Sequence, residues 1–228
     1  MARRTAMGLL GSAGVAGLAG CSLFRQRWKY RYRLTVQVGR DGETYASSSV
    51  IEVVRTEAYN AILGEAKGEA VAVDVPGSGT LFALLRGKPG DADWAFTMPH
   101  YAFEAQLGSV AMVDRAILDK LEQMQGVKVD LKPEHYPMLV RFRDINDPTT
   151  VQLADPTDLA ASFGSGVTLK RITVEVTDEA VTTGIGKRLG WLETQTGTLV
   201  RRPANVPLGD MRPEQRVIAT DFKQGNSK

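Results

Sequence analysis

The sequence has little of the side-chain chemistry on which many enzyme sites depend. Its 228 residues include one cysteine and two histidines. A single cysteine excludes an internal disulfide framework, and no zinc, dinucleotide or calcium-loop spacing is present. Catalytic triads assemble from distant positions, so missing motifs alone do not exclude an enzyme. Two histidines and no second thiol nevertheless leave few ways to build one. The sequence therefore favours binding over catalysis, and we predict no metal and no cofactor.

Acidic residues are missing from the first forty positions, where eight of the basic residues lie. From Asp41 onward, 20 basic and 26 acidic side chains give a net charge of −6. Such an asymmetry between segments indicates that the basic end is directed at a charged surface. No basic stripe lies elsewhere in the chain, so we expect no nucleic-acid partner.

Charge is also missing from residues 5–20, which follow the basic pair Arg3-Arg4. An uncleaved membrane helix needs about 20 mostly apolar residues, and residues 5–24 would just reach that length. Five glycines make this run only weakly apolar. The basic residues after it would also lie on the exported side, against the positive-inside tendency. A cleaved export signal therefore fits the run better than a membrane anchor does.

The run ends in Leu18-Ala19-Gly20-Cys21, and the whole pattern resembles the signal peptide and lipobox of a bacterial lipoprotein. In that family the cysteine thiol takes a diacylglycerol, and the leader is cut before it. The resemblance implies a signal peptide over residues 1–20, lipidation of Cys21 and a lipidated tether over residues 21–27. It also implies a cell-envelope protein that faces the periplasm and has no free thiol.

Two details of the leader bear on export and on the target membrane. Arg3-Arg4 resembles a twin-arginine export signal, with ordinary secretion as the alternative. Ser22 follows the cysteine, and by resemblance to Gram-negative lipoproteins it favours the outer membrane, with the inner membrane as the alternative.

The predicted tether and the strand after it are basic. The residues concerned are Arg25, Arg27, Lys29, Arg31 and Arg33. Anionic headgroups attract such residues near a bilayer by about 1 kcal/mol each, and one acyl signal often needs a second to hold firmly. The predicted partners are therefore the membrane, through acylated Cys21 and through anionic lipid headgroups, and an unknown envelope protein. The alternative is that these side chains form only the solvated face of a strand.

Alternation of apolar and polar residues with period 2 predicts two antiparallel hairpins. The first joins residues 28–38 to residues 45–55 through a glycine-flanked turn. The second joins residues 70–75 to residues 80–85 around Pro76-Gly77-Ser78-Gly79. Three further short strands are predicted, over residues 138–142, 150–153 and 167–176.

Two helices are also predicted. The longer one is predicted to begin near Ser109, with an apolar stripe of helical spacing from Val113 to Met124. A shorter helix is predicted to start with Asp155 as its N-cap and to end near Phe163. Residues 28–223 are therefore predicted to form a single β-rich α+β domain of antiparallel hairpins, with one longer and one or two short helices. Residues 224–228 are predicted to form a frayed tail.

An aromatic-rich segment, predicted to be irregular over residues 89–108, is the candidate binding site. Its candidate residues are Trp94, Phe96, His100, Tyr101 and Glu104. Long irregular segments in compact domains are often functional, and a histidine can act as a base near neutral pH. The alternatives are a loop that plugs one end of a sheet, and a metal or catalytic centre in which Asp91 and Asp93 join His100 and Glu104.

The sequence thus predicts a lipid-anchored envelope protein with a non-enzymatic interaction or structural domain. The first alternative is a lipoprotein that binds a small molecule or an ion through residues 94–104. The second is a hydrolase, which would need His100 or His135 next to a serine and a carboxylate. Residues 30–36, 68–74 and 171–178 resemble a set of proteobacterial proteins, a likeness that implies no activity.

Overall fold

The computed structural model describes residues 26–59, 61–88, 91–112, 114–201, 204–207 and 210–225. The predicted signal peptide, Cys21, Ser22 and Arg25 lie outside the described residues. The fold class is α+β, as the sequence predicts. In the described part of the chain, ten strands form two antiparallel sheets, and helices pack beside them.

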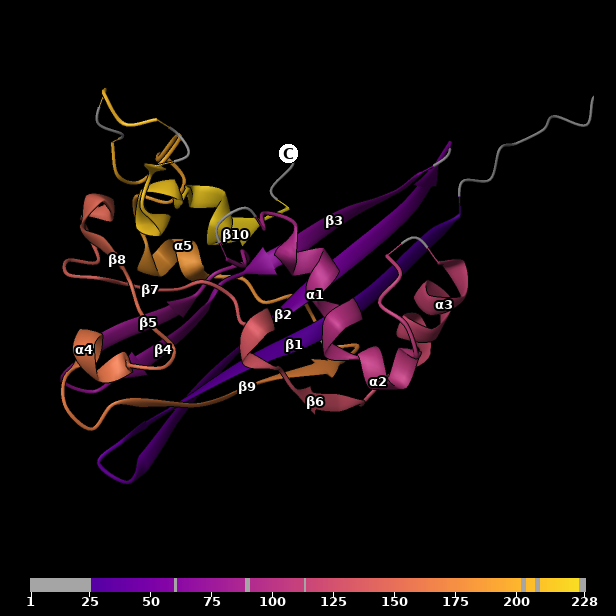
Figure 1. Cartoon of the computed structure of the whole chain (residues 1–228), viewed down its shortest axis with the longest axis horizontal. Coiled ribbons are helices and arrows are strands. Elements are labelled where there is room, and N and C mark those ends of the chain that lie inside the picture. The colour runs from indigo at the N-terminus through magenta and orange to yellow at the C-terminus, as the bar shows by residue number, and fades with distance from the viewer. Residues whose placement is uncertain are drawn as a thin grey trace, which may run out of the picture.

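The larger sheet has six strands in the order β10-β3-β2-β1-β9-β6 (Figure 1). They are β1 (Arg27–Arg40), β2 (Glu43–Ala58), β3 (Ala61–Glu69), β6 (Lys128–Asp130), β9 (Thr168–Val176) and β10 (Lys223–Gln224). β1 and β2 form the first predicted hairpin, in which Arg27 lies opposite Thr56. β3 continues from β2 as a second hairpin, and β9 pairs with the other side of β1.

Every second side chain of β1 is buried, as the alternation predicts. The buried set is at most 2% exposed and consists of Trp28, Tyr30, Tyr32, Leu34, Val36 and Val38. Removing each from water contributes about 2 kcal/mol to folding. A one-residue slip would move the whole set to solvent, so this burial fixes the register of the strand. The other side chains of β1 form the outer face of the sheet, with ion pairs such as Arg31–Glu52.

The smaller sheet lies between two hydrophobic cores. Its strands, in the order β4-β5-β7-β8, are β4 (Val71–Val75), β5 (Gly79–Ala83), β7 (Leu139–Phe142) and β8 (Val151–Leu153). One face packs on the inner face of the larger sheet through residues such as Val73 and Leu81. The other face, with Phe82 and Val140, packs on the C-terminal segment, which contributes Phe222.

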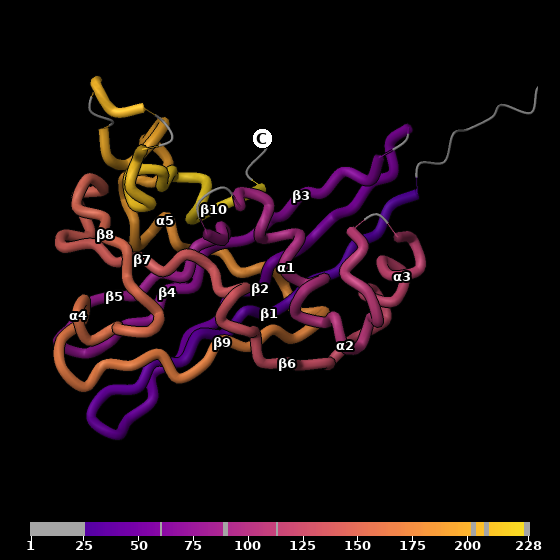
Figure 2. Tube along the Cα trace, in the orientation of Figure 1, coloured from indigo at the N-terminus to yellow at the C-terminus, as the bar shows by residue number. Residues whose placement is uncertain are grey.

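Three helices cover the rest of the inner face of the larger sheet (Figure 2). They are α1 (Trp94–Ala102), α2 (Glu104–Leu107) and α3 (Arg115–Gln123). The other helical elements are short: α4 (Leu159–Phe163), α5 (Ile185–Arg188), and the 3-10 turns η1 (Pro133–His135), η2 (Pro148–Thr150), η4 (Pro213–Arg216) and η5 (Ala219–Asp221).

The prediction that residues 89–108 are irregular was wrong, because α1 and α2 lie in this segment. Pro99 lies inside α1, where it has no N–H to donate to the carbonyl oxygen of Ala95. The phenol of Tyr32 donates to that oxygen instead, at 2.7 Å. A distant strand therefore supplies the hydrogen bond that the proline removes.

The helix predicted to begin near Ser109 begins later in the structure. α3 starts at Arg115, because the carboxylate of Asp114 caps it and accepts from the amide of Ala116 at 2.8 Å.

Two other predicted boundaries also differ from the structure. Asp155 does not cap α4, because the N-cap is Asp158. The carboxylate of Asp155 instead accepts hydrogen bonds from the backbone and hydroxyl of Thr157, which form a turn before the helix. Gln224, predicted to lie in the frayed tail, belongs to β10 and pairs with Gly68 of β3.

Candidate functional site

The structure does not gather the predicted site residues around one cavity. Trp94 is 3% exposed and donates from Nε1 to the carbonyl oxygen of His135 at 2.9 Å. Tyr101 is 37% exposed, and its ring stacks on the ring of His135 with centroids 4.8 Å apart. Glu104 is exposed and lies 3.9 Å from the ammonium group of Lys132. Trp94 therefore packs in the core, whereas Tyr101 and Glu104 lie at the surface.

Phe96 and His100 lie near a buried arginine on β2. The guanidinium carbon of Arg55 lies 5.2 Å from the centroid of the Phe96 ring, and its Nη2 donates to the carbonyl oxygen of Met112 at 2.7 Å. Gly64 makes room for this contact, because a Cβ there would lie 2.5 Å from both Arg55 Nη1 and the Phe96 ring. These side chains fasten α1 to the larger sheet.

His100 is fully buried, and within the described residues neither of its ring nitrogens has a hydrogen-bond partner. Burial, and to a smaller extent the positive charge of Arg55, together lower the pKa of His100 to about 4. Tyr30 lies near the same arginine, and burial raises the pKa of its phenol. His100 is therefore a neutral core residue at pH 7.

The described residues do not assemble the predicted metal or hydrolase centres. They contain no cluster of three or more histidine, cysteine, aspartate or glutamate side chains that could hold a metal ion. The ring of His100 has no partner there, and the ring of His135 stacks on Tyr101. Within the described residues, neither histidine ring forms a hydrogen bond with a serine or a carboxylate.

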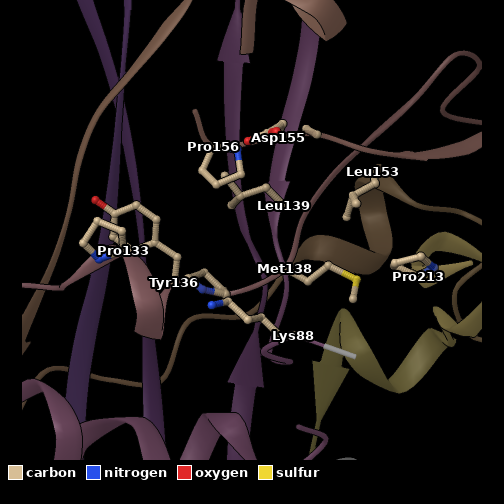
Figure 3. Close-up of a pocket in the computed structure, with 11 residues that line it drawn as sticks. Lys88, Pro133, Tyr136, Met138, Leu139, Leu153, Asp155, Pro156 and Pro213 are labelled. Atoms are coloured by element: carbon tan, nitrogen blue, oxygen red, sulfur yellow. The ribbon is translucent and has the colours of Figure 1, made fainter. Parts of the chain in front are cut away.

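A groove of about 270 Å³ lies where the smaller sheet meets η1 and η4 (Figure 3). Its lining residues are Lys88, Pro133, Tyr136, Pro137, Met138, Leu139, Leu153, Ala154, Asp155, Pro156 and Pro213. Most of these side chains are apolar, and Leu153 is 42% exposed beside the groove. An exposed large apolar side chain at a concave site is typical of a binding surface.

The base of the groove is held by sheet hydrogen bonds. Leu139 and Ala154 are each 1% exposed, and the amide of Ala154 donates to the carbonyl oxygen of Leu139 at 2.9 Å. The amide of Met138 donates to the carbonyl oxygen of Arg86 at 2.8 Å, which ties the start of β7 to the chain after β5. These bonds hold the base of the groove in a single backbone arrangement.

Proline residues form much of the rim. Pro133 and Pro213 each open a 3-10 turn, and Pro137 and Pro156 follow η1 and β8. The ring of proline fixes the backbone angle φ, so these positions lose little freedom when a ligand binds. The groove is therefore preformed in its backbone.

Two charged side chains reach the groove, and only one is available to a ligand. Asp155 already accepts two hydrogen bonds from Thr157, which lower the pKa of its carboxyl group. Lys88 is exposed, and its ammonium group has no ion-pair or hydrogen-bond partner among the described residues. The groove thus combines apolar sides with one accessible positive charge.

A polar hollow of about 440 Å³ adjoins the groove, with Leu153 shared between the two. Arg143 and Arg212 line this hollow together with Glu214. Arg212 lies 3.2 Å from the carboxylate of Glu214, so part of its charge is compensated. A ligand longer than the groove would pass from apolar to polar surroundings at Leu153.

The predicted membrane-proximal basic residues fall into two groups, apart from Arg25, which is outside the described residues. Arg31 and Arg33 form ion pairs with carboxylates on neighbouring strands and loops. Arg27 and Lys29 lie at the start of β1 and are exposed, although the ammonium group of Lys29 also pairs with Glu52 at 3.0 Å. In the described part of the chain, no helix is long and apolar enough to cross a membrane.

None of the groove residues stood out in the sequence, because they come from four segments spread between Lys88 and Pro213. The prolines were the only local signal, and singly they predict turns and helix starts. The groove is therefore the candidate site on its geometry. In comparisons with known proteins, no protein-family model, curated protein or solved structure matches this chain.

Proposed function

We propose that this chain is a lipid-anchored protein of the cell envelope whose domain binds a small amphipathic anion in the groove. The observation that carries the proposal is the pairing of apolar sides with one available cation, Lys88. A ligand with an apolar body and a carboxylate or sulfonate end matches both features. A volume of about 270 Å³ lies just below the common range for ligand pockets, so the ligand is small.

The groove is tested with anilinonaphthalene sulfonate, a fluorescent probe that has an apolar body and one negative charge. We expect its fluorescence to rise on binding. Leu153→Asp should abolish the rise, because it places a negative charge beside the apolar side of the groove. Lys88→Ala should weaken binding about tenfold, which corresponds to the loss of one charge-assisted hydrogen bond.

Two controls distinguish binding in the groove from non-specific binding of the probe elsewhere on the protein. Lys187→Ala removes an exposed lysine of α5 that does not line the groove and should leave probe binding unchanged. The uncharged probe phenylnaphthylamine should lose affinity in Leu153→Asp but keep it in Lys88→Ala. If both groove variants bind anilinonaphthalene sulfonate as the unaltered protein does, the groove is not the binding site.

The lipid anchor is tested separately at Cys21. Cells that express the unaltered chain are fed an alkyne fatty acid, which should label the protein in the membrane fraction. Cys21→Ser should remove the label and release the protein, because the thiol is the predicted attachment point. Unchanged membrane retention of the unlabelled variant would instead indicate an uncleaved N-terminal helix.

A protein ligand is the second candidate, and the position of β8 favours it. β8 is one of the two edge strands of the smaller sheet, and edge strands can add a strand from a partner. Gln152 on β8 is exposed, so a photo-crosslinker there would give a discrete protein adduct in native envelopes if this candidate holds. A small-molecule ligand gives no such adduct.

A further inference from the structure

Exposed large apolar side chains gather at the turn between β2 and β3. Tyr59 is 92% exposed and Leu63 is 58% exposed, the two highest values among the large apolar residues of the described chain. Ala61, between them, is also exposed. We call these three residues the β2–β3 tip. Most of the apolar surface of Tyr59 and Leu63 is therefore open to solvent.

The tip lies beside the place where the described chain begins. Arg27, the first residue of β1, is opposite Thr56 of β2, and Thr56 is opposite Leu63 of β3. The amide of Glu57 donates to the carbonyl oxygen of Gln26 at 2.9 Å. Figure 1 shows the β2–β3 turn and the start of β1 at the same end of the long axis, away from the smaller sheet.

The reach of the predicted tether is compatible with contact between the tip and the bilayer that holds Cys21. Gln26 is the fifth residue after Cys21, and an extended chain of five residues spans at most about 17 Å. Tyr59 is three residues beyond Thr56, and a strand rises about 3.4 Å per residue, so the tip projects about 10 Å past the start of β1. A bilayer that holds lipidated Cys21 therefore lies within reach of the tip.

The charge next to the tip suits an anionic surface. Arg27 and Leu63 share the outer face of the sheet, because they flank Thr56 in the same cross-strand row. Arg27 has no ion-pair partner in the described residues, whereas the half-exposed Lys29 pairs with Glu52, so Arg27 supplies the available positive charge. Glu65 is the next residue on the outer face of β3, so the apolar surface of that strand ends at Leu63.

We propose that the β2–β3 tip enters the headgroup region of the bilayer that holds Cys21, with Arg27 beside anionic headgroups. This proposal rests on the proposed lipid anchor. Tyrosine favours the membrane interface because its ring is apolar and its hydroxyl is polar. The tip is a second attachment that orients the domain and directs the smaller sheet with its groove away from the membrane (Figure 1).

The test uses the acylated full chain with one added cysteine that carries the dye nitrobenzoxadiazole. The dye is placed at Ala61→Cys in the tip, or at Ser165→Cys in the exposed loop before β9 as the matched control. The protein is reconstituted in vesicles of phosphatidylethanolamine and phosphatidylglycerol that contain a spin-labelled lipid quencher. We expect a blue shift and quenching at position 61, and neither at position 165.

A second set of variants checks that the tip residues cause the contact. Tyr59→Asn with Leu63→Ser should abolish the quenching at position 61, whereas Tyr101→Asn should leave it unchanged. Asparagine suits the positive φ of 53° at Tyr59, so the turn should be retained, as equal thermal unfolding would verify. Quenching that survives the double change would mean that the tip side chains do not make the contact.

The acyl label and the dye report on different claims. An acylated protein with an unquenched dye at position 61 overturns the tip contact and leaves the anchor intact. A protein without acyl label overturns the anchor, and with it the tip contact that rests on it. A blue shift that needs no vesicles and grows with protein concentration also overturns the proposal, because a second copy would then cover the tip.

Discussion

His100 shows how a single buried residue makes the stability of this domain depend on pH. In the folded protein the pKa of His100 is about 4, whereas an unfolded histidine has a pKa near 6.5. Between these values the unfolded state binds a proton that the folded state does not. Stability is therefore retained above pH 6.5 and is lost as the pH falls toward 4.

We predict that the unaltered protein loses about 2 kcal/mol of unfolding free energy through His100 between pH 7 and pH 5. His100→Gln cannot take up this proton, so its stability should fall less over the same range. Urea unfolding at both pH values measures the difference. His135→Gln is the control, because the other histidine ring stacks on Tyr101 near the surface. Equal losses in all three proteins would contradict a buried neutral His100.

At the scale of elements, the strands that can be predicted from the sequence are those whose buried side chains are large. β1 has an aromatic or branched side chain at every second position, so its alternation predicted its burial. β3 has Ile62, Gly64 and Ala66 on its inner face, a row too small to predict a strand. Its Gly64 is required by Arg55 and Phe96 of other elements, which no local pattern can show.

Helix α1 was missed for a similar reason, since Pro99 locally predicts an interruption. The helix persists because Tyr32 supplies the hydrogen bond to Ala95 that Pro99 cannot. Tyr32→Phe should cost about 1–2 kcal/mol of unfolding free energy, because the buried carbonyl of Ala95 then has no donor.

A double-mutant cycle tests this compensation. In a Pro99→Ala background the new backbone amide can donate to Ala95, so adding Tyr32→Phe should cost less than it does alone. Urea unfolding of the four proteins gives the coupling. Tyr30→Phe serves as the matched control, because its hydroxyl has no partner in the described residues and its loss should not depend on Pro99. Additive losses for Tyr32→Phe and Pro99→Ala would show that the phenol does not replace the missing amide.

At the scale of the whole molecule, the groove could not be predicted because it exists only where distant segments meet. Its base comes from β7 and β8, and one side comes from η4, which precedes the C-terminal turn. The same smaller sheet joins the two cores: Phe82 faces the second core, whereas its neighbours Leu81 and Ala83 face the first. Packing of either core therefore depends on the sheet between them.

This shared sheet predicts that the described chain unfolds as one cooperative unit. Trp28 is buried in the first core, and Trp191 packs against Phe142 and Phe222 of the second. In variants that keep Trp28 or Trp191 as the single tryptophan, the fluorescence transition in urea should coincide with the loss of circular dichroism, because loss of either core removes one covered face of the smaller sheet. Phe222→Ala should cost about 3–5 kcal/mol of unfolding free energy. It should therefore lower the fluorescence midpoint and the circular dichroism midpoint together in either variant. A Trp191 transition that precedes the loss of circular dichroism in the same variant would instead make the C-terminal segment an independent unit, and the groove would then open before the larger sheet unfolds.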